Sequence, residues 1–457
     1  MPFRYGIATM TKVPLAFVSV NADIDGQRHT GIASDLLPPK WFTKVADKAL
    51  EVEIQEMERV ILHAMELAAG RHADSAYRLW RGLYEDQLAW AREQGLPPLL
   101  ANFGTSLVER ALIEAACRAL QHPFATALRQ GPLGLEPGDL HASLQGATCA
   151  DLLPSAPLVS THVRHTVGLG DPLSDSDIEE PLRDGLPQSL SACIRAYGLS
   201  HFKIKVMGKP EMDFPRLKEL QVLLDKEAPP TFVFSLDGNE QFQGWTAFRE
   251  YWEALRGRPG MEDFLSRMMF VEQPLHRDRA LNRDQAGSLT DWEGHPAFII
   301  DESDATVDAL PVALEMGYAG TSHKNCKGVF KGVANACLLR QQTRQRPEVK
   351  RLMSGEDLCT IGPVALLQDL AVMGTLGIQS VERNGHHYHA GLSQLPTAVQ
   401  SAVREHHPDL YVPSDQGWPT LRIESGAVSL TSVCAAPFGT GFALDVEPFT
   451  SVSGFEA

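Results

Sequence analysis

The chain has 457 residues and a formal net charge of −16 at pH 7. This acidic balance argues against nucleic acid and anionic membrane surfaces as partners, because phosphate contacts require clustered Lys and Arg side chains. A hydrophobic content of 44% with 21% charged residues is typical of a soluble globular protein that buries a substantial core.

The seven cysteines are odd in number, scattered, and form no CxxC motif, so the sequence predicts neither a disulfide framework nor a zinc site. The first residues lack the apolar stretch and cleavage site of a secretion signal, and no run of roughly 18 apolar residues is present. We therefore expect a cytoplasmic protein without a membrane span.

Residues 1–150 predict an α+β domain. The stretch 5–33 is typical of short strands joined by an Asp-Gly turn. Apolar residues then recur at helical spacing, first around 54–64 and again in 106–120. Between the strand pattern and the first helical pattern lies the proline-containing segment 32–44, which carries Trp41. We expect it to be a lid with an exposed tryptophan that contacts substrate; an ordinary rigid surface loop is the alternative.

From about residue 155 a unit repeats: an apolar run, a polar residue at its end, and an amphipathic helix. Eight such units predict a parallel (β/α)8 barrel over 151–414, with the tail 415–457 returning to the first domain. The sixth run is polar throughout and is the weakest strand. An open doubly wound sheet is the rival fold, but its glycine-rich phosphate turn is poorly matched here. The runs are 158–167, 201–207, 231–237, 268–274, 297–303, 320–327, 351–357 and 378–384.

Three carboxylates stand at the ends of neighbouring runs: Asp237, Glu272 and Asp301. In a (β/α)8 barrel the carboxyl ends of the strands meet at one face, where active sites form. Three anions placed so close would repel each other, and a hard divalent cation relieves that repulsion. Mg2+ with carboxylate ligands is the expected ion.

Lysines accompany these acids. Lys203 and Lys205 alternate on the second run and therefore point to the same side of the strand, and Lys324 ends the sixth run. Strands two and six lie opposite each other in an eight-stranded barrel, so two lysines would face one substrate from opposite sides. Near a metal cation and other ammonium groups, we expect the pKa of such a lysine to fall, which makes the amine a usable base.

The ordered motifs KxK, DxN (Asp237, Asn239), EQP (from Glu272), DES (from Asp301) and the lysine at 324 resemble the enolase superfamily. The similarity is greatest to the branch named for muconate-lactonizing enzyme and mandelate racemase. The N-terminal strands, the helix in 106–120 and the tail are similar to that family's capping domain. The resemblance therefore covers most of the chain.

The resemblance implies that Asp237, Glu272 and Asp301 ligate Mg2+, which binds the carboxylate of a small substrate. Lys205 would be the base on one face and Lys324 the acid or base on the other, with Lys203 polarising the carboxylate or tuning Lys205. The reaction would begin with abstraction of the proton α to the carboxylate. Racemisation or epimerisation, or β-elimination such as dehydration, would follow; ammonia elimination and cycloisomerisation are also open.

Several residues near these motifs compete for roles or extend the site. Lys327 competes with Lys324, and Glu302 competes with Asp301 as a ligand. Mandelate racemase itself would carry a histidine on the seventh strand, but that run ends in SGED, so its subgroup is disfavoured. The following residues are candidates for substrate binding: Trp41, Asn239, Glu302, Lys327, Glu356, Glu382, His386 and His387.

The string HHxH at 386–389 suggests either a substrate-binding loop, an ordinary solvated loop, or a second metal site. Adjacent histidines on a strand point to opposite faces, so we disfavour the metal site. Chains of this family are usually shorter, and we place the additional residues in 70–100 and 275–295, where they would shape substrate access or the contact of a homo-oligomer.

Two other functions remain open. A barrel lysine could form a Schiff base with a carbonyl substrate, as in an aldolase or lyase, but that chemistry does not require three strand-end carboxylates. A non-catalytic barrel kept for binding predicts that at least one ligand or lysine is lost, and none is missing.

Overall fold

The computed structural model describes residues 3–5, 8–285 and 289–452. Its centre is a closed barrel of eight parallel strands: each strand pairs with the next along the chain, and the last pairs with the first. This confirms the predicted (β/α)8 barrel and all eight runs. The strands are β5 (Ser160–Val167), β6 (His201–Lys205), β7 (Val233–Asp237), β8 (Met268–Glu272), β9 (Phe298–Ile300), β10 (Gly320–His323), β11 (Leu352–Gly355) and β12 (Ser380–Glu382).

The polar sixth strand, β10, forms because its side chains find partners inside the protein. Thr321 Oγ1 donates a hydrogen bond to Asp304 at 2.9 Å, and the hydroxyl of Ser322 donates to Asp301. Gly320 lies so close to β11 that a Cβ atom there would be 1.7 Å from the carbonyl oxygen of Leu352. Hydrogen bonding and close backbone approach therefore replace apolar packing in this strand.

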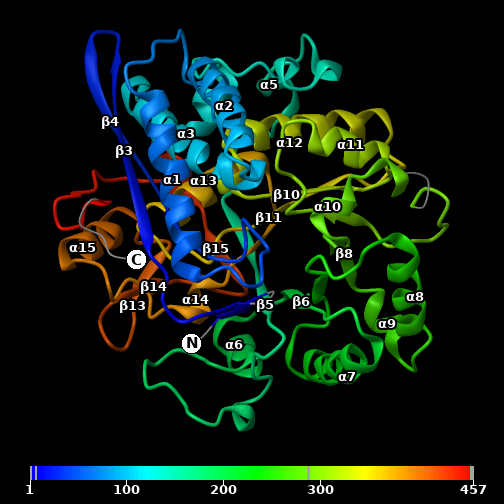
Figure 1. Ribbon diagram of the computed structural model, residues 1–457. Helices are drawn as coiled ribbons and strands as arrows, with labels where there is room; N and C mark the ends of the chain where they lie inside the picture. Colours follow the sequence, from blue (N-terminus) through cyan, green and yellow to red (C-terminus); the bar gives the residue numbers. More distant parts are fainter. Residues whose placement is uncertain (1–2, 6–7, 286–288, 453–457) are drawn as a thin grey trace.

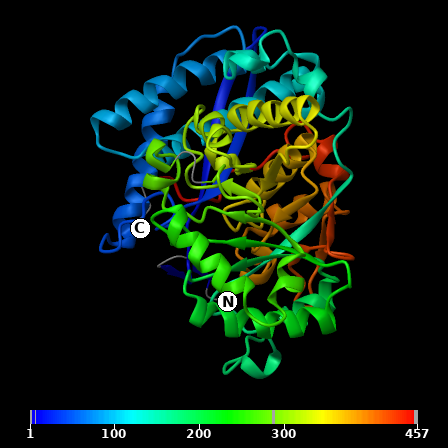
Figure 2. The ribbon, with the colours of Figure 1, turned by 90° about the vertical axis from the view of Figure 1, so that its right-hand side faces the viewer.

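Helices follow the strands and cover the barrel (Figures 1 and 2). In α8 the predicted apolar face is buried, with Trp245 and Phe248 packed on Phe298 of β9. The longer helices are α6 (Leu190–Tyr197), α7 (Pro210–Glu227), α8 (Trp245–Arg256), α11 (Ala309–Glu315), α12 (Val329–Gln345), α13 (Ala365–Leu376) and α15 (Thr397–His406); the shorter ones are α9 (Met261–Leu265), α10 (Arg277–Ala280) and α14 (Gly385–Tyr388).

The N-terminal part joins a long antiparallel hairpin to three helices, gathered on one side of the molecule (Figure 1). Asp25 and Gly26 form the predicted turn with φ of 51° and 79°. Helix α3 is buried along almost its whole length against the hairpin and the other two helices. The elements are β1 (Phe3–Tyr5), β2 (Ala8–Met10), β3 (Leu15–Ile24), β4 (Gln27–Leu36), α1 (Leu50–Ala68), α2 (Ala76–Glu93), α3 (Pro98–Leu120), α4 (Phe124–Gln130) and α5 (Cys149–Leu152).

The end of the chain touches both parts of the molecule. Strand β15 pairs antiparallel with β5 of the barrel, whereas Arg118 of α3 donates a hydrogen bond to the carbonyl oxygen of Phe442 at 2.8 Å. The ring of Phe449 lies 4.5 Å from that of Phe17 in the hairpin. The remaining elements here are β13 (Tyr411–Pro413), β14 (Pro419–Leu421), β15 (Ala427–Ser429) and α16 (Thr431–Ala435).

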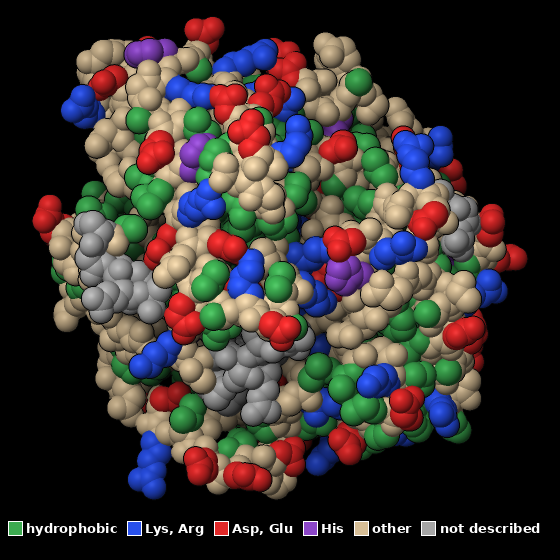
Figure 3. Space-filling model, viewed as in Figure 1, with side chains coloured by type: hydrophobic (Ala, Val, Ile, Leu, Met, Phe, Trp, Pro, Cys, Tyr) green, Lys and Arg blue, Asp and Glu red, His purple; other side chains and the backbone are tan. Residues whose placement is uncertain are grey.

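Charged side chains of both signs are interspersed over the face that Figure 3 shows. All seven cysteines are free thiols. None of the helices in the described part of the chain has the length and apolarity that a membrane span requires.

Candidate active site

A buried ammonium group lies at the centre of the carboxyl ends of the strands. Lys203 Nζ lies 2.9 Å from Glu272, 3.1 Å from Asp237, 3.1 Å from Glu356 and 2.9 Å from Glu382. These four acids come from four different strand ends, so the barrel brings them together as the strand-end pattern predicts. Burial alone would lower the pKa of Lys203, but the four carboxylates raise it well above its ordinary value.

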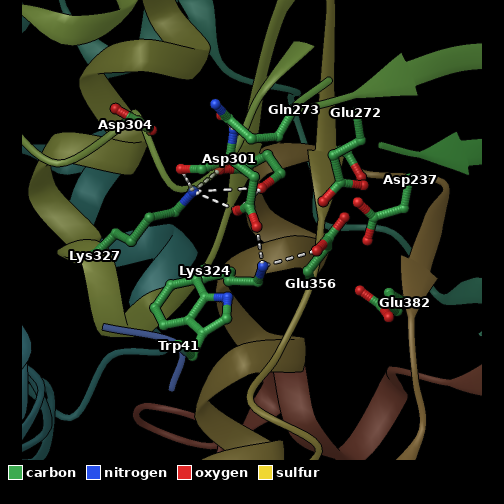
Figure 4. Close-up of polar contacts among 12 residues, drawn as sticks. Trp41, Asp237, Glu272, Gln273, Asp301, Asp304, Lys324, Lys327, Glu356 and Glu382 are labelled. Atoms are coloured by element: carbon green, nitrogen blue, oxygen red, sulfur yellow. Dashed lines mark hydrogen bonds and ion pairs between the residues drawn. The ribbon is translucent and has the colours of Figure 1, made fainter. Parts of the chain in front are cut away.

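A second cluster surrounds Asp301 at the end of β9 (Figure 4). Lys324 Nζ lies 2.6 Å from one of its carboxylate oxygens, and Lys327 Nζ lies 3.0 Å from the other. Lys327 also donates to the carbonyl oxygen of Ser322 at 2.6 Å, so this ammonium is bound by the backbone. Lys324 contacts Glu356 at 2.9 Å and lines the cavity described below.

The pKa of Lys324 is raised, whereas the sequence led us to expect a lowered value. Burial would lower it, but Asp301 and Glu356 raise the pKa well above its ordinary value. The two carboxylates in direct contact with the ammonium outweigh the neighbouring cations. In this environment Lys324 is held in its charged form.

Lys205, on β6, has a different environment. Its Nζ lies 3.2 Å from Asp237 and donates to the amide oxygen of Asn239 at 3.0 Å. It therefore contacts one carboxylate, whereas Lys324 contacts two. Because β6 and β10 are the second and sixth strands of the barrel, Lys205 and Lys324 reach the same cavity from opposite walls.

Carboxylates suited to a divalent cation lie between these two walls. Oxygens of Glu272, Asp301 and Glu356 all lie within 4.8 Å of one another. Glu272 Oε2 is buried and has no hydrogen-bond partner. Burial and the neighbouring Glu356 raise the pKa of Glu272 well above its ordinary value. This surplus of buried carboxylate oxygens fits a hard cation such as Mg2+.

Asp237 lies at the same face, paired with Glu272 across neighbouring strands. Although burial opposes its ionisation, Lys203 and Lys205 hold the pKa of Asp237 well below its ordinary value. Asp237 and Asp301 line the cavity, whereas Glu356 lies behind it, with its other oxygen 3.1 Å from Arg164.

The cavity above these groups is small, about 80 Å³. Typical small-molecule pockets are about 300 Å³ or larger, so a substrate requires the covering residues to move. Charged side chains dominate the lining, which comprises Lys40, Lys44, Lys203, Lys205, Asp237, Glu240, Arg277, Asp301, Glu302, Lys324, Asp357 and Glu382 together with Pro38, Trp41, Asn239, Leu358, Cys359 and Asn384.

The covering segment differs in part from the predicted lid over 32–44. Strand β4 continues to Leu36, so the loop proper begins after it. Trp41 is half-buried rather than exposed, because its ring packs over Lys324 with the ammonium 4.7 Å from the ring centroid (Figure 4). Arg277 holds the loop by donating to the carbonyl oxygens of Trp41 at 3.0 Å and Phe42 at 3.1 Å.

Glu302 lines the cavity but is not bound by Lys324 or Lys327. Burial, Asp301 and Glu240 raise the pKa of Glu302 to about 8. The two carboxyl groups therefore differ in their surroundings. Asp301 is ionised between two lysines, whereas the carboxyl group of Glu302 has a raised pKa and contacts neither of them.

Sequence reasoning missed two arginines. Arg164 lies inside the barrel, fully buried, and donates to Ser354 at 2.7 Å as well as to Glu356. The sequence offers one indication of this position: Arg164 is a charged residue in the middle of the first apolar run. Arg277 follows β8 in the segment assigned to additional residues, and only its contacts with the loop and with Glu240 at 2.7 Å reveal its position.

The histidines at 386, 387 and 389 do not line the cavity. His386 and His387 lie on the helical turn α14 rather than on a strand, so the argument from strand alternation does not apply to them. His387 instead contacts Cys193 of α6, and His386 contacts His165 of β5.

Solved structures of one fold match most of the chain. A mandelate racemase/muconate lactonizing enzyme from Bordetella bronchiseptica RB50 is 14% identical, with a TM-score of 0.57 over 96% of this chain and 99% of that one. The chain has the fold of the mandelate racemase/muconate lactonizing enzyme structures. A dipeptide epimerase from Enterococcus faecalis V583, complexed with Mg and the dipeptide L-Leu-L-Tyr, is 13% identical, with a TM-score of 0.55 over 93% and 91%.

The third structure, a 3,6-anhydro-D-galactonate cycloisomerase from Zobellia galactanivorans, is 11% identical, with a TM-score of 0.52 over 92% of this chain and 94% of that one. No protein-family model and no curated protein sequence matches this chain. The likeness therefore concerns the fold, and the chemistry must be argued from the residues of the cavity.

Proposed function

We propose that this protein abstracts the proton α to the carboxylate of a small substrate with the help of Mg2+, and then returns a proton or expels a β-substituent. The observation that carries the proposal is the placement of Lys205 and Lys324 on opposite walls of one cavity, with strand-end carboxylates between them. The three solved structures described above are named as a mandelate racemase/muconate lactonizing enzyme, a dipeptide epimerase and a cycloisomerase.

Asp237, Glu272 and Asp301 would hold the Mg2+ ion. Neither Glu272 nor Glu356 lines the cavity, but Glu272 keeps one oxygen without a partner, whereas Arg164 and Lys203 bind the two oxygens of Glu356. We therefore keep Glu272 and prefer Asp237, which lines the cavity, to Glu356 as the third ligand. When bound, the cation would supply positive charge where the enediolate of a substrate carboxylate develops.

The two lysines differ in a way that assigns their roles. Lys324, held by Asp301 and Glu356, begins as an ammonium and donates a proton to its face of the substrate. Lys205, which contacts Asp237 and the amide oxygen of Asn239, faces the substrate from the opposite wall and accepts the α-proton. Lys203, enclosed by four acids, contributes positive charge beneath the substrate carboxylate.

Closure of the cavity would follow from the loop that carries Trp41. Expulsion of water strengthens the electrostatic interactions among the lysines, the acids and the substrate.

We further propose that the substrate is a small carboxylate and that the protein assembles as a homo-oligomer in the cytoplasm. Light scattering of the purified protein tests the assembly.

The experiment that tests the proposal is α-hydrogen exchange in D2O, followed by mass spectrometry over a library of hydroxy acids, amino-acid derivatives and dipeptides. We expect Mg2+-dependent deuterium uptake that Lys205→Ala abolishes, while Lys324→Ala changes the stereochemistry of the product. The matched control is Lys226→Ala, an exposed lysine on α7. Uptake that persists without Mg2+ or in Lys205→Ala would overturn the mechanism.

The same protein preparation tests the rival chemistry. A Schiff-base lyase would be trapped covalently by borohydride in the presence of its carbonyl substrate. We expect no trapping on Lys203 or Lys324, because the carboxylates around them keep both amines protonated and therefore poor nucleophiles.

A further inference from the structure

A cluster of nitrogen and sulfur donors lies outside the catalytic cavity. One donor atom from each of His165, Cys193 and His387 lies within 4.8 Å of the others. All three side chains are at least 96% buried, and none lines the cavity. They belong to β5, α6 and α14, which lie together in Figure 1, so three elements distant in sequence converge at this point.

The orientation of His165 is compatible with this cluster. Arg164, its neighbour on β5, points into the barrel and contacts Ser235 and Ser354. Since successive side chains of a strand point to opposite faces, His165 points outward, toward the helices. The cluster is thus separated from the catalytic lysines by the barrel wall.

The spacing of two donors fits a tetrahedral ion. His387 Nδ1 lies 3.5 Å from Cys193 Sγ. A zinc ion with Zn–N of about 2.0–2.1 Å and Zn–S of about 2.3 Å places two such ligand atoms about 3.5 Å apart at a tetrahedral angle. The pair therefore needs little movement to share one ion.

The ring of His165 also has an outer partner of the kind that a metal-bound imidazole requires. His165 Nδ1 lies 3.1 Å from His386 Nε2, a hydrogen bond that fixes the orientation of the His165 ring. Partners of this kind orient the ring and select its tautomer. His386 Nδ1, by contrast, is buried without any partner.

We propose that His165, Cys193 and His387 form a second metal site, which binds Zn2+. Imidazole and thiolate ligands favour zinc over the magnesium that the carboxylates of the cavity would select. Binding converts the Cys193 thiol to a thiolate, and the proton leaves to solvent. Three protein ligands leave the fourth position of the tetrahedron for water.

The site would tie the first strand of the barrel to the loop after the last strand. His387 lies three residues beyond Asn384, which lines the catalytic cavity. A metal cross-link between β5, α6 and α14 therefore stabilises the position of the residues that follow Glu382. This role is structural and independent of the reaction proposed above.

The test is metal analysis by mass spectrometry of protein purified without chelator, joined to Co2+ substitution of the metal-free protein. We expect one zinc per chain, and a thiolate-to-cobalt charge-transfer band with the intense visible bands of tetrahedral Co2+. In Cys193→Ser the band disappears, and in His387→Gln the zinc affinity falls at least ~10-fold. Cys434→Ser and His389→Gln are the matched controls and keep both signals.

Three outcomes overturn the proposal. The first is the absence of both zinc and the cobalt band in the folded wild-type protein. The second is zinc that persists in Cys193→Ser and His387→Gln but is lost in Glu272→Gln, because that metal would belong to the carboxylates. The third is stoichiometric copper or iron on the same residues. Circular dichroism of each variant verifies folding, and His387→Gln decides the matter if Cys193→Ser does not fold.

Discussion

The ammonium of Lys324 lies 4.7 Å from the centroid of the Trp41 ring. Lys324 directly follows barrel strand β10, whereas Trp41 belongs to the loop between the N-terminal hairpin and α1. The same loop is fixed by hydrogen bonds from Arg277, which follows another barrel strand. The covering loop therefore contacts the proposed acid directly, and its position and the charge of Lys324 are coupled.

We predict that Trp41→Leu lowers kcat/KM by about tenfold, the equivalent of a cation–π interaction of 1–2 kcal/mol. Trp41→Phe keeps an aromatic face over the ammonium and should lose much less. Steady-state kinetics on the substrate found by α-hydrogen exchange measures both. Equal losses in the two variants would show that the ring acts only by filling space.

The choice of the third magnesium ligand can be tested with two isosteric variants. We expect Asp237→Asn to weaken Mg2+ binding at least ~10-fold, because it removes a charged ligand. Glu356→Gln should change Mg2+ affinity less, but it leaves Arg164, Lys203 and Lys324 without a shared counter-ion. Loss of one member of a buried ion pair costs about 3–5 kcal/mol of unfolding free energy.

Isothermal titration with Mg2+ and urea unfolding of both variants separate these effects. The reverse pattern, in which Glu356→Gln abolishes Mg2+ binding and Asp237→Asn does not, would replace Asp237 in the ligand set by Glu356. That set matches the three acids whose oxygens lie within 4.8 Å of one another.

The barrel could be predicted from sequence because its pattern is local and repeated. Most of the runs carry a polar residue at or near their ends, and helices lie between them, such as the one from Trp245 to Leu255. Even the polar run that became β10 was placed correctly by its position in the series. Strand order then fixes which residues meet at the carboxyl face, so the convergence of Asp237, Glu272 and Lys203 required no side-chain detail.

The remaining features depend on orientation across long sequence distances. Nothing near Trp41 in sequence indicates that its ring covers a lysine 283 positions further on. Strand alternation, the argument against a metal site at the histidines after β12, does not hold, because their turn of helix brings His387 to Cys193, 194 positions earlier. The pKa of Lys324 likewise depends on Asp301 and Glu356, whose contacts only the folded chain defines.

The packing of the hairpin on α3 leads to a stability prediction. A Cβ atom on Gly31 of β4 would lie 1.9 Å from the carbonyl oxygen of Ala111 and 2.6 Å from the amide nitrogen of Ala115. Both are backbone atoms of a buried helix, so they cannot move without displacing α3. We expect Gly31→Ala to reduce the free energy of unfolding by about 1–3 kcal/mol.

Gly82→Ala is the matched control. Gly82 lies inside α2, where an added Cβ would approach only the flexible end of Arg71. Alanine is favoured over glycine in a helix by about 1 kcal/mol, so this variant should be unchanged or more stable. If thermal unfolding gave the same loss for both variants, close backbone approach would not be the cause at Gly31.

Glu109 of α3 predicts a pH dependence of stability. Its two carboxylate oxygens accept hydrogen bonds from the first amides of α12, Val329 at 2.9 Å and Phe330 at 2.7 Å, and so join the N-terminal helices to the barrel. Burial raises the pKa of Glu109 from 4.5 to about 7, because desolvation outweighs these hydrogen bonds and the nearby Arg110 and Lys331.

Between pH 4.5 and 7 the folded state therefore binds a proton at Glu109 that the unfolded state has released. As the pH rises through this window, Glu109 lowers the free energy of unfolding by on the order of 3 kcal/mol. Outside the window the contribution of Glu109 does not change with pH. We expect Glu109→Gln to remove this decrease, while Glu262→Gln, an exposed control, retains it. Urea unfolding at a series of pH values measures the difference. A decrease of the same size in Glu109→Gln would assign it to other groups.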